Sequence, residues 1–354
     1  MTFCAGLSQR FLNGRIGFDY SYYQDNSYDQ IVNPRTSQSP GYIFNLANVG
    51  QIYNKGMELA ISGKPIETKN FTWETILNIS GNRGTVGTIH SSLPVLYITD
   101  VQVGNAKAAS FENGKFMGIS GSKWGRTDDG KVILDQFGMP TYASAGSTAL
   151  YIGNREPKFF GGFTNNFQYK GLTFSFLLDY RIGGHVYNGT EYWLTTTGMS
   201  KRTENRESLT ITGVVNTGTA TAPVYADKTF TFNANERYQV GSVTQSGKYI
   251  IQNYWSDYYT RESANFMTET NWLRLRSISL SYSLPQSVLN NIKFIKGCVF
   301  SFTGTNLFVL TNYKGLDPES SAAGSGVIGS SSVGIDYVNV PATASLAFGI
   351  NLRF

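Results

Sequence analysis

Bulky apolar residues alternate with small or polar residues along eight segments of this chain. A period of two places successive side chains on opposite faces of a β-strand, so each segment predicts a strand with one apolar and one polar face. In Leu172–Tyr180, for example, Phe174 and Phe176 alternate with Thr173 and Ser175. The predicted strands are Arg15–Tyr23, Lys55–Gly63, Phe71–Ser80, Gly161–Tyr169, Leu172–Tyr180, Ser277–Leu284, Cys298–Phe308 and Ala344–Phe354.

The alternation changes phase just before the sixth segment. Leu273 and Leu275 lie in the opposite register to Ile278, so a regular strand would place them on different faces. One extra residue in a β-bulge would bring all three to the same face. We therefore expect a bulge near Arg276, or a strand that begins beyond the bilayer.

The connections between the predicted strands alternate in length. Three are short, Ser62–Phe71, Tyr169–Leu172 and Leu284–Cys298, whereas the connections over 24–54, 81–160, 181–271 and 310–343 are long. Outer-membrane barrels have short periplasmic turns and long outer loops. The pattern predicts eight antiparallel membrane-spanning strands with both chain ends in the periplasm. The first and last of these strands would then be unpaired edges.

Composition supports strands in a membrane. Charged residues make up only 15% of the chain, below the roughly 25% usual in soluble proteins. Aromatic residues reach 14%, with 22 Tyr and 23 Phe. The net charge is +5, but the basic residues are scattered singly and form no run that could follow a nucleic-acid backbone. We therefore expect no nucleic-acid partner.

No motif in the chain indicates catalysis, a metal or a cofactor. Cys4, Cys298, His90 and His185 stand far apart and in no metal-ligand spacing, and no nucleophile lies beside a base. The acidic segment "TDDGKVILDQFG" from Thr127 lacks EF-hand spacing, so we expect a solvated turn rather than a calcium site. No apolar stretch is long enough for a spanning helix, and the first residues do not form a signal peptide.

A soluble β-sandwich is an alternative, because its strands also alternate. Two features argue against it. The polar face carries Ser, Thr and Asn rather than Lys and Glu, and aromatic residues gather at strand ends, as in the interfacial girdles of membrane barrels. The residues assigned to these girdles are Tyr22, Tyr23, Trp73, Tyr169, Tyr180, Phe308 and Phe354.

Seven segments resemble, in order along the chain, the barrel of SusC/RagA-like TonB-dependent outer-membrane receptors. They are "NGRIGFDYSYYQ" from Asn13, "NKGMELAISG" from Asn54, "FTWETILNISGNRGTV" from Phe71, "YIGNREPKFFGGFTNNFQYKGLTFSFLLDYRIGG" from Tyr151, "NWLRLRSISLSYSLP" from Asn271, "FTGTNLFVLTNYKGLDPE" from Phe302 and the terminal "LAFGINLRF".

The resemblance implies a partial all-β, antiparallel transmembrane barrel, in which residues 1–354 supply about eight of 22 strands. The family's signal peptide, carboxypeptidase-like extension, energy-coupling box and plug domain have no counterpart in this sequence. The resemblance also implies a non-enzymatic importer of oligosaccharides or peptides in the outer membrane. Its partners would be a SusD-like surface lipoprotein, the TonB energy-coupling complex and membrane lipid. A complete eight-stranded barrel that acts as an adhesin or a porin is an alternative. However, the residues predicted to face the barrel interior are small and suit a wider lumen.

Aromatic residues in the long loops are candidates for stacking on sugar rings or for contact with a partner protein, although packing within the loops is the plainer interpretation. They are Trp124, Tyr192, Trp193, Trp255, Tyr258 and Tyr259. The segment "AAGSGVIGSSS" from Ala322 is rich in glycine and serine, as a moving outer flap or a disordered loop tip would be.

Two further expectations concern the faces and the end of the barrel. One face should contact lipid through Phe18, Leu59, Leu77, Phe176, Leu280, Phe300 and Phe348. The last strand alternates strictly up to the final residue, a pattern resembling the signal that outer-membrane assembly machinery reads by strand pairing. The residues of this predicted assembly signal are Phe348, Ile350, Leu352 and Phe354.

Overall fold

The computed structural model of this chain describes most of its length. The described residues are 1–32, 47–48, 50–89, 95–143, 150–240, 243–290, 294–319, 321–322 and 334–354. His90 and residues 323–332 of the glycine- and serine-rich segment lie outside them. Within the described ranges, no helix combines the length and the apolar character that crossing a membrane requires.

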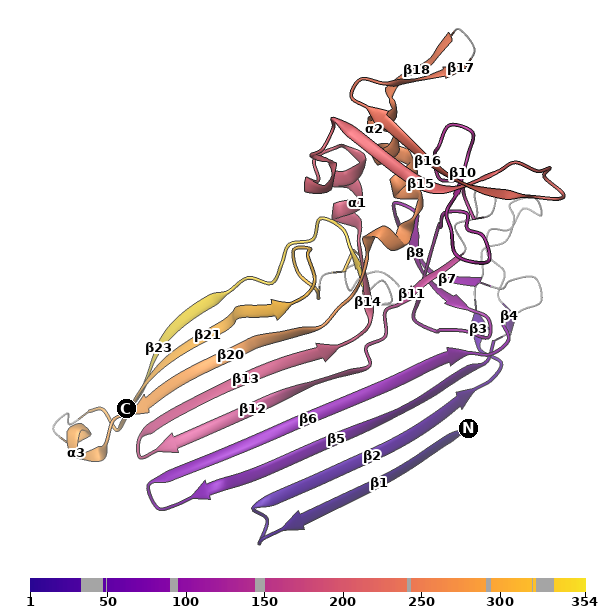
Figure 1. The fold of residues 1–354 in the computed structure, drawn as a ribbon. Coiled ribbons are helices and arrows are strands. Elements are labelled where there is room, and N and C mark those ends of the chain that lie inside the picture. The colour runs from indigo at the N-terminus through magenta and orange to yellow at the C-terminus, as the bar shows by residue number, and fades with distance from the viewer. Residues whose placement is uncertain are drawn as a thin grey trace.

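A single antiparallel sheet of nine strands, here called the wall, forms the larger part of the molecule (Figure 1). Strands that follow one another along the chain are neighbours in the sheet, from β1 at one edge to β23 at the other. The wall consists of β1 (Thr2–Phe11), β2 (Ile16–Ser27), β5 (Ile52–Glu67), β6 (Phe71–Val86), β12 (Phe159–Tyr169), β13 (Leu172–Ile182), β20 (Trp272–Ser283), β21 (Gly297–Thr311) and β23 (Ser345–Arg353). All eight predicted strands are present. One open sheet replaces the two packed sheets that a sandwich would need.

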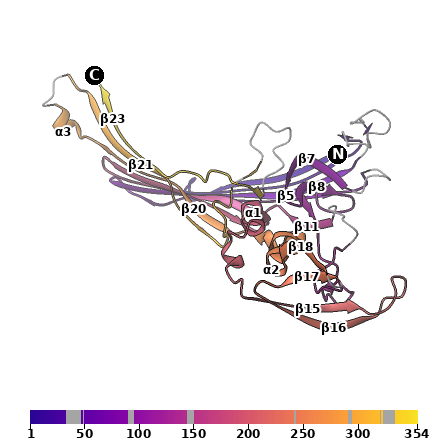
Figure 2. The ribbon, with the colours of Figure 1, turned by 90° about the horizontal axis from the view of Figure 1, so that it is seen from above.

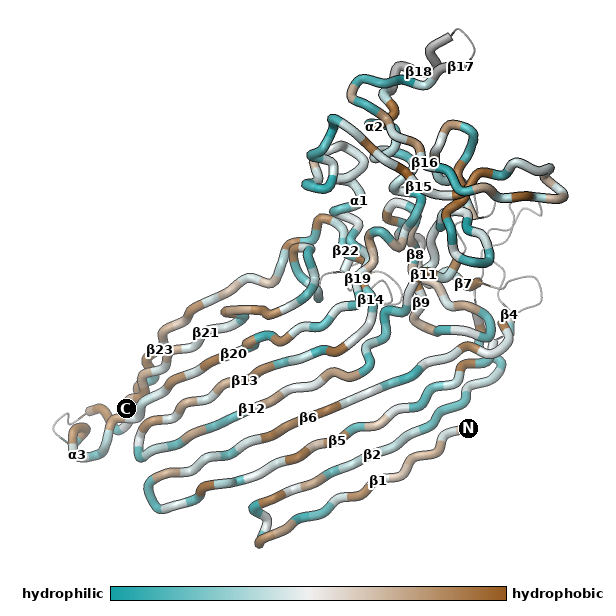
Figure 3. Tube along the Cα trace, viewed as in Figure 1, coloured by the Kyte–Doolittle hydropathy of each residue, from teal (hydrophilic) through white to brown (hydrophobic). Residues whose placement is uncertain are grey.

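The registers bring the predicted lipid-facing residues to one face. Residues directly opposite each other on neighbouring strands project to the same side of a sheet. One such row runs through Phe18, Ile61, Leu77, Phe163 and Leu178, and another through Phe174, Leu280, Phe302 and Phe348. Leu59, Phe176 and Phe300 lie two residues along their strands from members of these rows and therefore share the face. Figure 3 shows hydrophobic and hydrophilic residues interspersed along the strands of the wall.

Tyr23 is not part of the interfacial girdle, contrary to the prediction. It pairs with Gly56, which in turn pairs with Asn82, and its hydroxyl donates to Asn82 Oδ1 at 2.9 Å. Tyr22 pairs with Met57 on the apolar face. Because adjacent residues of a strand project to opposite faces, Tyr22 and Tyr23 cannot both face the membrane.

The predicted bulge is present at Arg276. Opposite β13, Ser277 pairs with Leu177 while Leu275 pairs with Leu178, so Arg276 is the additional residue. The register with β21 shifts at the same position. The bulge brings Leu275 to the same face as Ile278 and corrects the change of phase seen in the sequence.

The first strand, β1, was not predicted. It pairs along its whole length with β2. In the turn between the two strands, Leu12, Asn13 and Gly14 have positive φ. Its apolar face includes the small residue Ala5 and the polar residue Gln9, which weaken the alternation in the sequence. The predicted edge at Arg15–Tyr23 is therefore wrong, and β1 is the edge instead.

The two chain ends lie at opposite ends of the wall (Figure 1). Thr2 pairs with Asp25, toward the long connections, whereas Arg353 pairs with Gly297, near the short turns. The expectation that both termini lie on the side of the short turns is thus wrong for the N-terminus. An additional strand reverses the direction in which the chain enters the sheet.

The short turns lie together at one end of the wall, and the connection between β20 and β21 includes α3 (Gln286–Leu289). Beyond the other end, the long connections fold together into what we call the outer assembly (Figures 1 and 2). Its strands are β3 (Ile31–Val32), β4 (Ala47–Asn48), β7 (Val95–Val103), β8 (Ala106–Phe111), β9 (Gly118–Gly121), β10 (Ile133–Leu134), β11 (Leu150–Asn154), β14 (His185–Asn188), β15 (Ser208–Asn216), β16 (Tyr225–Asn233), β17 (Arg237–Val240), β18 (Val243–Tyr249), β19 (Met267–Glu269) and β22 (Ile335–Asp336). Its helical segments are α1 (Gly189–Thr196), α2 (Ile250–Asn253), η1 (Lys201–Thr203), η2 (Tyr254–Tyr258), η3 (Tyr259–Arg261) and η4 (Ser263–Phe266).

Two buried cores hold the outer assembly. Each joins residues from connections that are distant in sequence, so burial of apolar surface fixes the loops relative to one another. One core contains Val103, Ala106, Ala108, Ile119, Tyr187, Phe266 and Ile335. The other contains Leu134, Met139, Ile211, Phe232, Ile250, Ile251 and Tyr254.

Candidate functional site in the outer assembly

The predicted loop aromatics meet in one cluster around Tyr259. The Tyr259 ring lies 4.8 Å from Trp255 and 6.2 Å from Trp124, measured between ring centroids. The Trp124 indole donates its N–H to the carbonyl oxygen of Tyr258 at 2.8 Å. These contacts tie the loop that follows β9 to the helical turns between β18 and β19.

Tyr192 and Trp193 join the same cluster from α1. The Tyr192 ring packs against Phe266 at 5.4 Å, and Phe266 lies 5.9 Å from Tyr259. Trp193 contacts Tyr192 edge-on at 5.3 Å and is 44% exposed. The structure thus brings together all six predicted residues, mostly by packing within the loops, and Trp193 is the most open to solvent.

Two arginines cover the aromatic faces. The Arg202 guanidinium lies 5.4 Å from the Tyr259 ring and 5.2 Å from the Phe266 ring, and it pairs with Glu191 at 3.0 Å. Arg261 lies 4.0 Å from the Tyr258 ring. Cations over aromatic rings are attracted by the ring quadrupole, so these arginines stabilise the cluster as well as adding charge.

The buried phenols near the cluster stay protonated at neutral pH. Burial raises the pKa of Tyr238 to about 12. Burial also raises the pKa of Tyr254, Tyr258 and Tyr192. A buried phenolate would lose its hydration, so the neutral form is favoured. These hydroxyls therefore remain available as hydrogen-bond donors.

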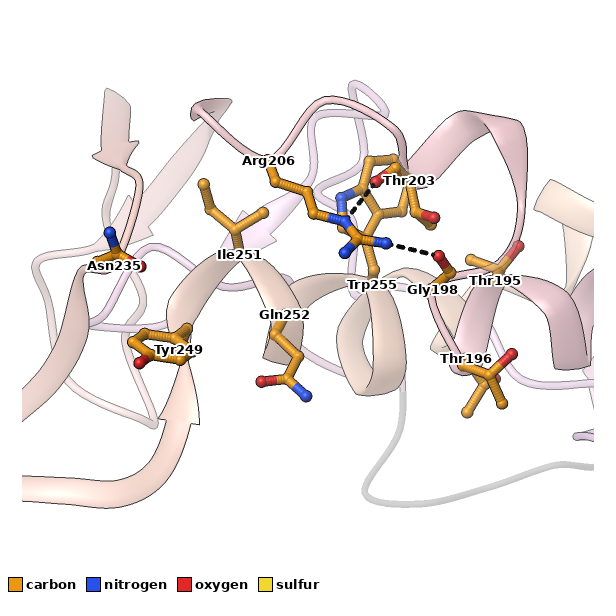
Figure 4. A pocket seen from close by; sticks show the side chains of 11 residues that line it. Thr195, Thr196, Gly198, Thr203, Arg206, Asn235, Tyr249, Ile251, Gln252 and Trp255 are labelled. Carbon is orange, nitrogen blue, oxygen red and sulfur yellow. Dashed lines mark hydrogen bonds between the residues drawn. The ribbon is translucent and has the colours of Figure 1, made fainter.

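A cavity of about 360 Å³ opens beside Trp255 (Figure 4). Arg206 projects into it and donates to the carbonyl oxygens of Gly198 at 2.8 Å and Thr203 at 3.4 Å. The Trp255 Nε1 atom is buried and has no hydrogen-bond partner among the described residues. The remaining lining is uncharged and rich in hydroxyl and amide groups, from Thr195, Thr196, Thr197, Asn235, Tyr249 and Gln252. Such a cavity offers several donors and acceptors to a small polar ligand.

A buried ion cluster fastens the outer assembly to the wall. Arg274, on the polar face of β20, donates to Asp317 at 2.6 Å and lies 2.8 Å from Glu319. Both side chains of the Arg274–Asp317 pair are almost fully buried, at 3% and 6% exposure. Asp317 Oδ2 also accepts from the backbone N–H of Ala342 at 3.0 Å. One arginine therefore holds both sides of the last long connection.

Arg276 extends the same ion cluster. As the bulged residue of β20, it reaches Asp179 of β13 at 2.6 Å and Glu319 at 2.9 Å. The bulge thus has a second consequence besides correcting the apolar face, because it turns a cation toward two carboxylates. The sequence pattern indicates the bulge but not this network, whose partners are separated by many residues.

A second buried contact closes the same connection. The Tyr313 hydroxyl donates to Asp336 Oδ2 at 2.7 Å, and Asp336 is fully buried on β22. Burial raises the pKa of the Asp336 carboxyl, and the hydrogen bond from Tyr313 acts in the opposite direction. No pattern in the sequence indicates this pair.

The remaining candidates of the sequence analysis are also placed. Thr127 and Asp129 hydrogen-bond within their own turn, and Lys131 pairs with Asp227 of β16 at 2.7 Å. Within the described part of the chain, no three His, Cys, Asp or Glu residues lie close enough together to hold a metal ion. Cys4 is exposed on β1, Cys298 is buried on β21, and both are free thiols.

Comparison with known proteins gives whole-chain matches. TonB-dependent receptor P26 of Formosa agariphila is 22% identical over 364 residues, which cover 98% of this chain and 34% of that protein. TonB-dependent receptor SusC of Bacteroides thetaiotaomicron is 26% identical over 371 residues, covering 100% of this chain and 32% of SusC. No protein-family model matches the chain.

The fold has a solved counterpart. The structure of the RagAB peptide transporter matches with a TM-score of 0.67 at 18% identity, covering 100% of this chain and 35% of the matched one. The chain therefore spans about a third of the length of its relatives. The chain is thus similar from end to end to SusC/RagA-like TonB-dependent receptors, and its antiparallel wall has the fold of their outer-membrane barrels.

Proposed function

We propose that this chain supplies barrel wall, lumen surface and part of the outer loops of a TonB-dependent importer of oligosaccharides or peptides. In this proposal a SusD-like surface lipoprotein delivers the substrate, and the TonB complex acts through parts of the receptor outside this chain. The role is transport rather than catalysis. The observation that carries the proposal is the continuous nine-stranded wall, with one apolar face, in a chain that matches named receptors from end to end.

Deleting the complete receptor gene tests this function. The deletion strain would be grown on single oligosaccharides or on peptides as the limiting nutrient, with growth on free sugars and amino acids as the control. We expect loss of growth on one polymer class and recovery when the gene is restored. Affinity purification of the restored receptor should recover a SusD-like lipoprotein. Unchanged growth on every oligosaccharide and peptide would contradict an import role.

We further propose that the loop aromatics form a contact surface for the substrate or for a partner protein. Some of them would touch the ligand directly, and the others would support these from behind. Trp193 is exposed and Trp255 borders the cavity, which supports a role in direct contact for these two residues. Trp124, Tyr192, Tyr258 and Tyr259 pack behind them and hold the surface in shape. Aromatic faces suit the apolar faces of sugar rings as well as peptide side chains.

We also propose that Phe348, Ile350, Leu352 and Phe354 form the assembly signal. The first three lie on β23 and Phe354 directly follows it, and the free edge of β23 leaves backbone donors and acceptors available for pairing. The Phe354 ring also stacks on Phe294 at 6.4 Å, so packing is a competing role. Phe354→Asp in the full-length receptor should reduce heat-modifiable barrel in the outer membrane while synthesis is unchanged. Phe294→Ala removes the stacking contact alone, and an equal loss in that variant would favour packing.

A further inference from the structure

A groove of about 290 Å³ lies on the apolar face of the wall, toward the outer assembly. Its lining includes Tyr20 and Tyr22 of β2, Met57 of β5 and Phe159 of β12. The ladder between β6 and β12 ends at the pair Ser80–Phe160, and the groove begins where the two strands are no longer paired. The groove is therefore a gap in the face that the receptor presents to the membrane, close to its outer surface.

A glycine allows two segments that border this groove to approach each other closely. A Cβ atom on Gly81 would lie only 3.0 Å from the Lys158 carbonyl oxygen and from the Phe159 ring. Such distances are too short for an unstrained contact, so a larger residue would force the two segments apart. The close approach at Gly81 fixes the position of Phe159 as one side of the groove.

Two cations lie side by side in the lining of the groove. Lys55 of β5 and Arg83 of β6 are directly paired in the register, and they lie on the same face as Leu59 and Leu77. Like charges placed opposite each other on neighbouring strands repel. A shared anion between them would convert this repulsion into two attractive contacts.

The protein itself supplies no such anion among the described residues. The Arg83 guanidinium donates to the carbonyl oxygens of Asn82 and Pro157, both at 3.3 Å. Neither Arg83 nor Lys55 has a carboxylate within ion-pair distance in the described chain. By contrast, the nearby Lys158 is already paired with Glu269 at 2.5 Å. Two positive charges at the edge of the apolar band are thus left to bind an external group.

We propose that this groove binds a phosphate-bearing lipid of the outer leaflet. The phosphate would lie between Lys55 and Arg83, and an acyl chain would descend over Tyr22, Met57 and Phe159 toward the apolar rows below. Tyrosine rings beside basic residues mark the level at which lipid headgroups meet hydrocarbon in a membrane. The occupant is a membrane lipid rather than free phosphate, because the anion-binding end continues into an apolar channel that faces the bilayer. This site is separate from the imported substrate.

The full-length receptor, purified in a mild non-ionic detergent, allows a direct test. Native mass spectrometry would measure binding of diphosphorylated lipid A, of the same lipid with its phosphates removed, and of inorganic phosphate. We expect the phosphorylated lipid to bind, and the double variant Lys55→Gln, Arg83→Gln to bind it at least about tenfold more weakly. The dephosphorylated lipid should show the same weakening in the unchanged receptor.

The matched control removes two positive charges at the other end of the wall. Lys69→Gln with Lys170→Gln changes the turns after β5 and β12, and it should leave lipid binding unchanged. Heat-modifiable migration would show that each variant is folded, and the single change Lys55→Gln, at an exposed residue, serves if the double variant does not assemble. Equal lipid binding in the unchanged and Lys55 variants would overturn the site. Displacement of the lipid by millimolar inorganic phosphate would overturn its assignment to a lipid.

Discussion

In the wall, each strand pairs with the next along most of its length in one continuous sheet, whereas the outer assembly consists of several small sheets and helical turns joined to one another by side-chain contacts. The wall repeats one backbone interaction many times, so no single residue dominates it. The outer assembly depends on a few side chains that each join several segments, such as Arg274 and Tyr259. Substitutions in the wall should therefore weaken the barrel locally, while substitutions at these few residues should release whole loops.

The largest effect should follow from Arg274→Leu. This change leaves the Asp317 and Glu319 carboxylates without their buried partner, and removing one member of a buried ion pair costs about 3–5 kcal/mol. We expect the last long connection to detach while the wall survives. Limited proteolysis of the detergent-solubilised receptor should then cut between 311 and 319, and heat-modifiable migration should persist.

Arg10→Leu is the matched control for that experiment. Arg10 also pairs with an aspartate of the wall, Asp19 at 2.9 Å, but both side chains are largely exposed. Exposed ion pairs contribute little, because water solvates the separated charges. Neither the protease pattern nor the barrel should change. If the Arg274 variant lost the barrel, or if residues 311–319 stayed resistant to protease in it, the proposed difference between the wall and the outer assembly would be wrong.

A smaller effect, within the wall, is expected from Gly161→Ala. A Cβ atom at this position would collide with the Asn78 carbonyl oxygen of β6, so the ladder between β6 and β12 must shift. Overpacking of this kind typically costs about 1–3 kcal/mol. The urea midpoint of the barrel should fall while the protease pattern of the outer assembly is unchanged. Gly297→Ala, where the new atom meets its neighbours at 3.5 Å or more, should be tolerated.

A buried polar contact within the wall gives a comparable but more specific test. The Trp73 indole donates to Asn165 Oδ1 at 2.9 Å on the apolar face, and Asn165 is only 2% exposed. Asn165→Leu would leave the indole N–H without an acceptor, at a cost of about 1–3 kcal/mol. Adding Trp73→Phe should recover part of the loss in a double-mutant cycle. Strictly additive losses would show that the hydrogen bond does not stabilise the wall.

The wall could be predicted because its rule is local. Alternation at period two is visible within a single strand, and the slip between Leu275 and Ile278 located the bulge at Arg276. The rule failed for β1, where Gln9 interrupts the apolar face, and for Tyr23, where two adjacent tyrosines could not both be assigned to the girdle. In both cases the pairing with a neighbouring strand decides the outcome, and one strand alone does not show it.

The candidate site could be predicted only as a set of residue types. Aromatic side chains in long loops drew attention to Trp193 and Tyr259, but not to the contacts between them. The pair Arg274–Asp317 and the facing cations Lys55 and Arg83 depend on register and on loop paths. Residues that meet only after the sheet has formed leave no periodic pattern in the sequence.

The smallest effect on stability should follow from Trp193→Ala, within the outer assembly. Trp193 is 44% exposed and contacts only the edge of Tyr192 among the rings of the cluster, so its removal should change stability by no more than about 0.5 kcal/mol. Tyr259, in contrast, packs against Trp255, Trp124 and Phe266, and Tyr259→Ala should expose the helical turns to protease.

If the exposed ring of Trp193 touches the imported ligand, Trp193→Ala lowers uptake while the protease pattern stays unchanged, whereas Tyr259→Ala changes both. Uptake that is unaffected by Trp193→Ala would remove this residue from the contact surface and leave the cluster with a packing role. An exposed aromatic residue that contributes little to folding is the one whose substitution separates ligand contact from loop structure.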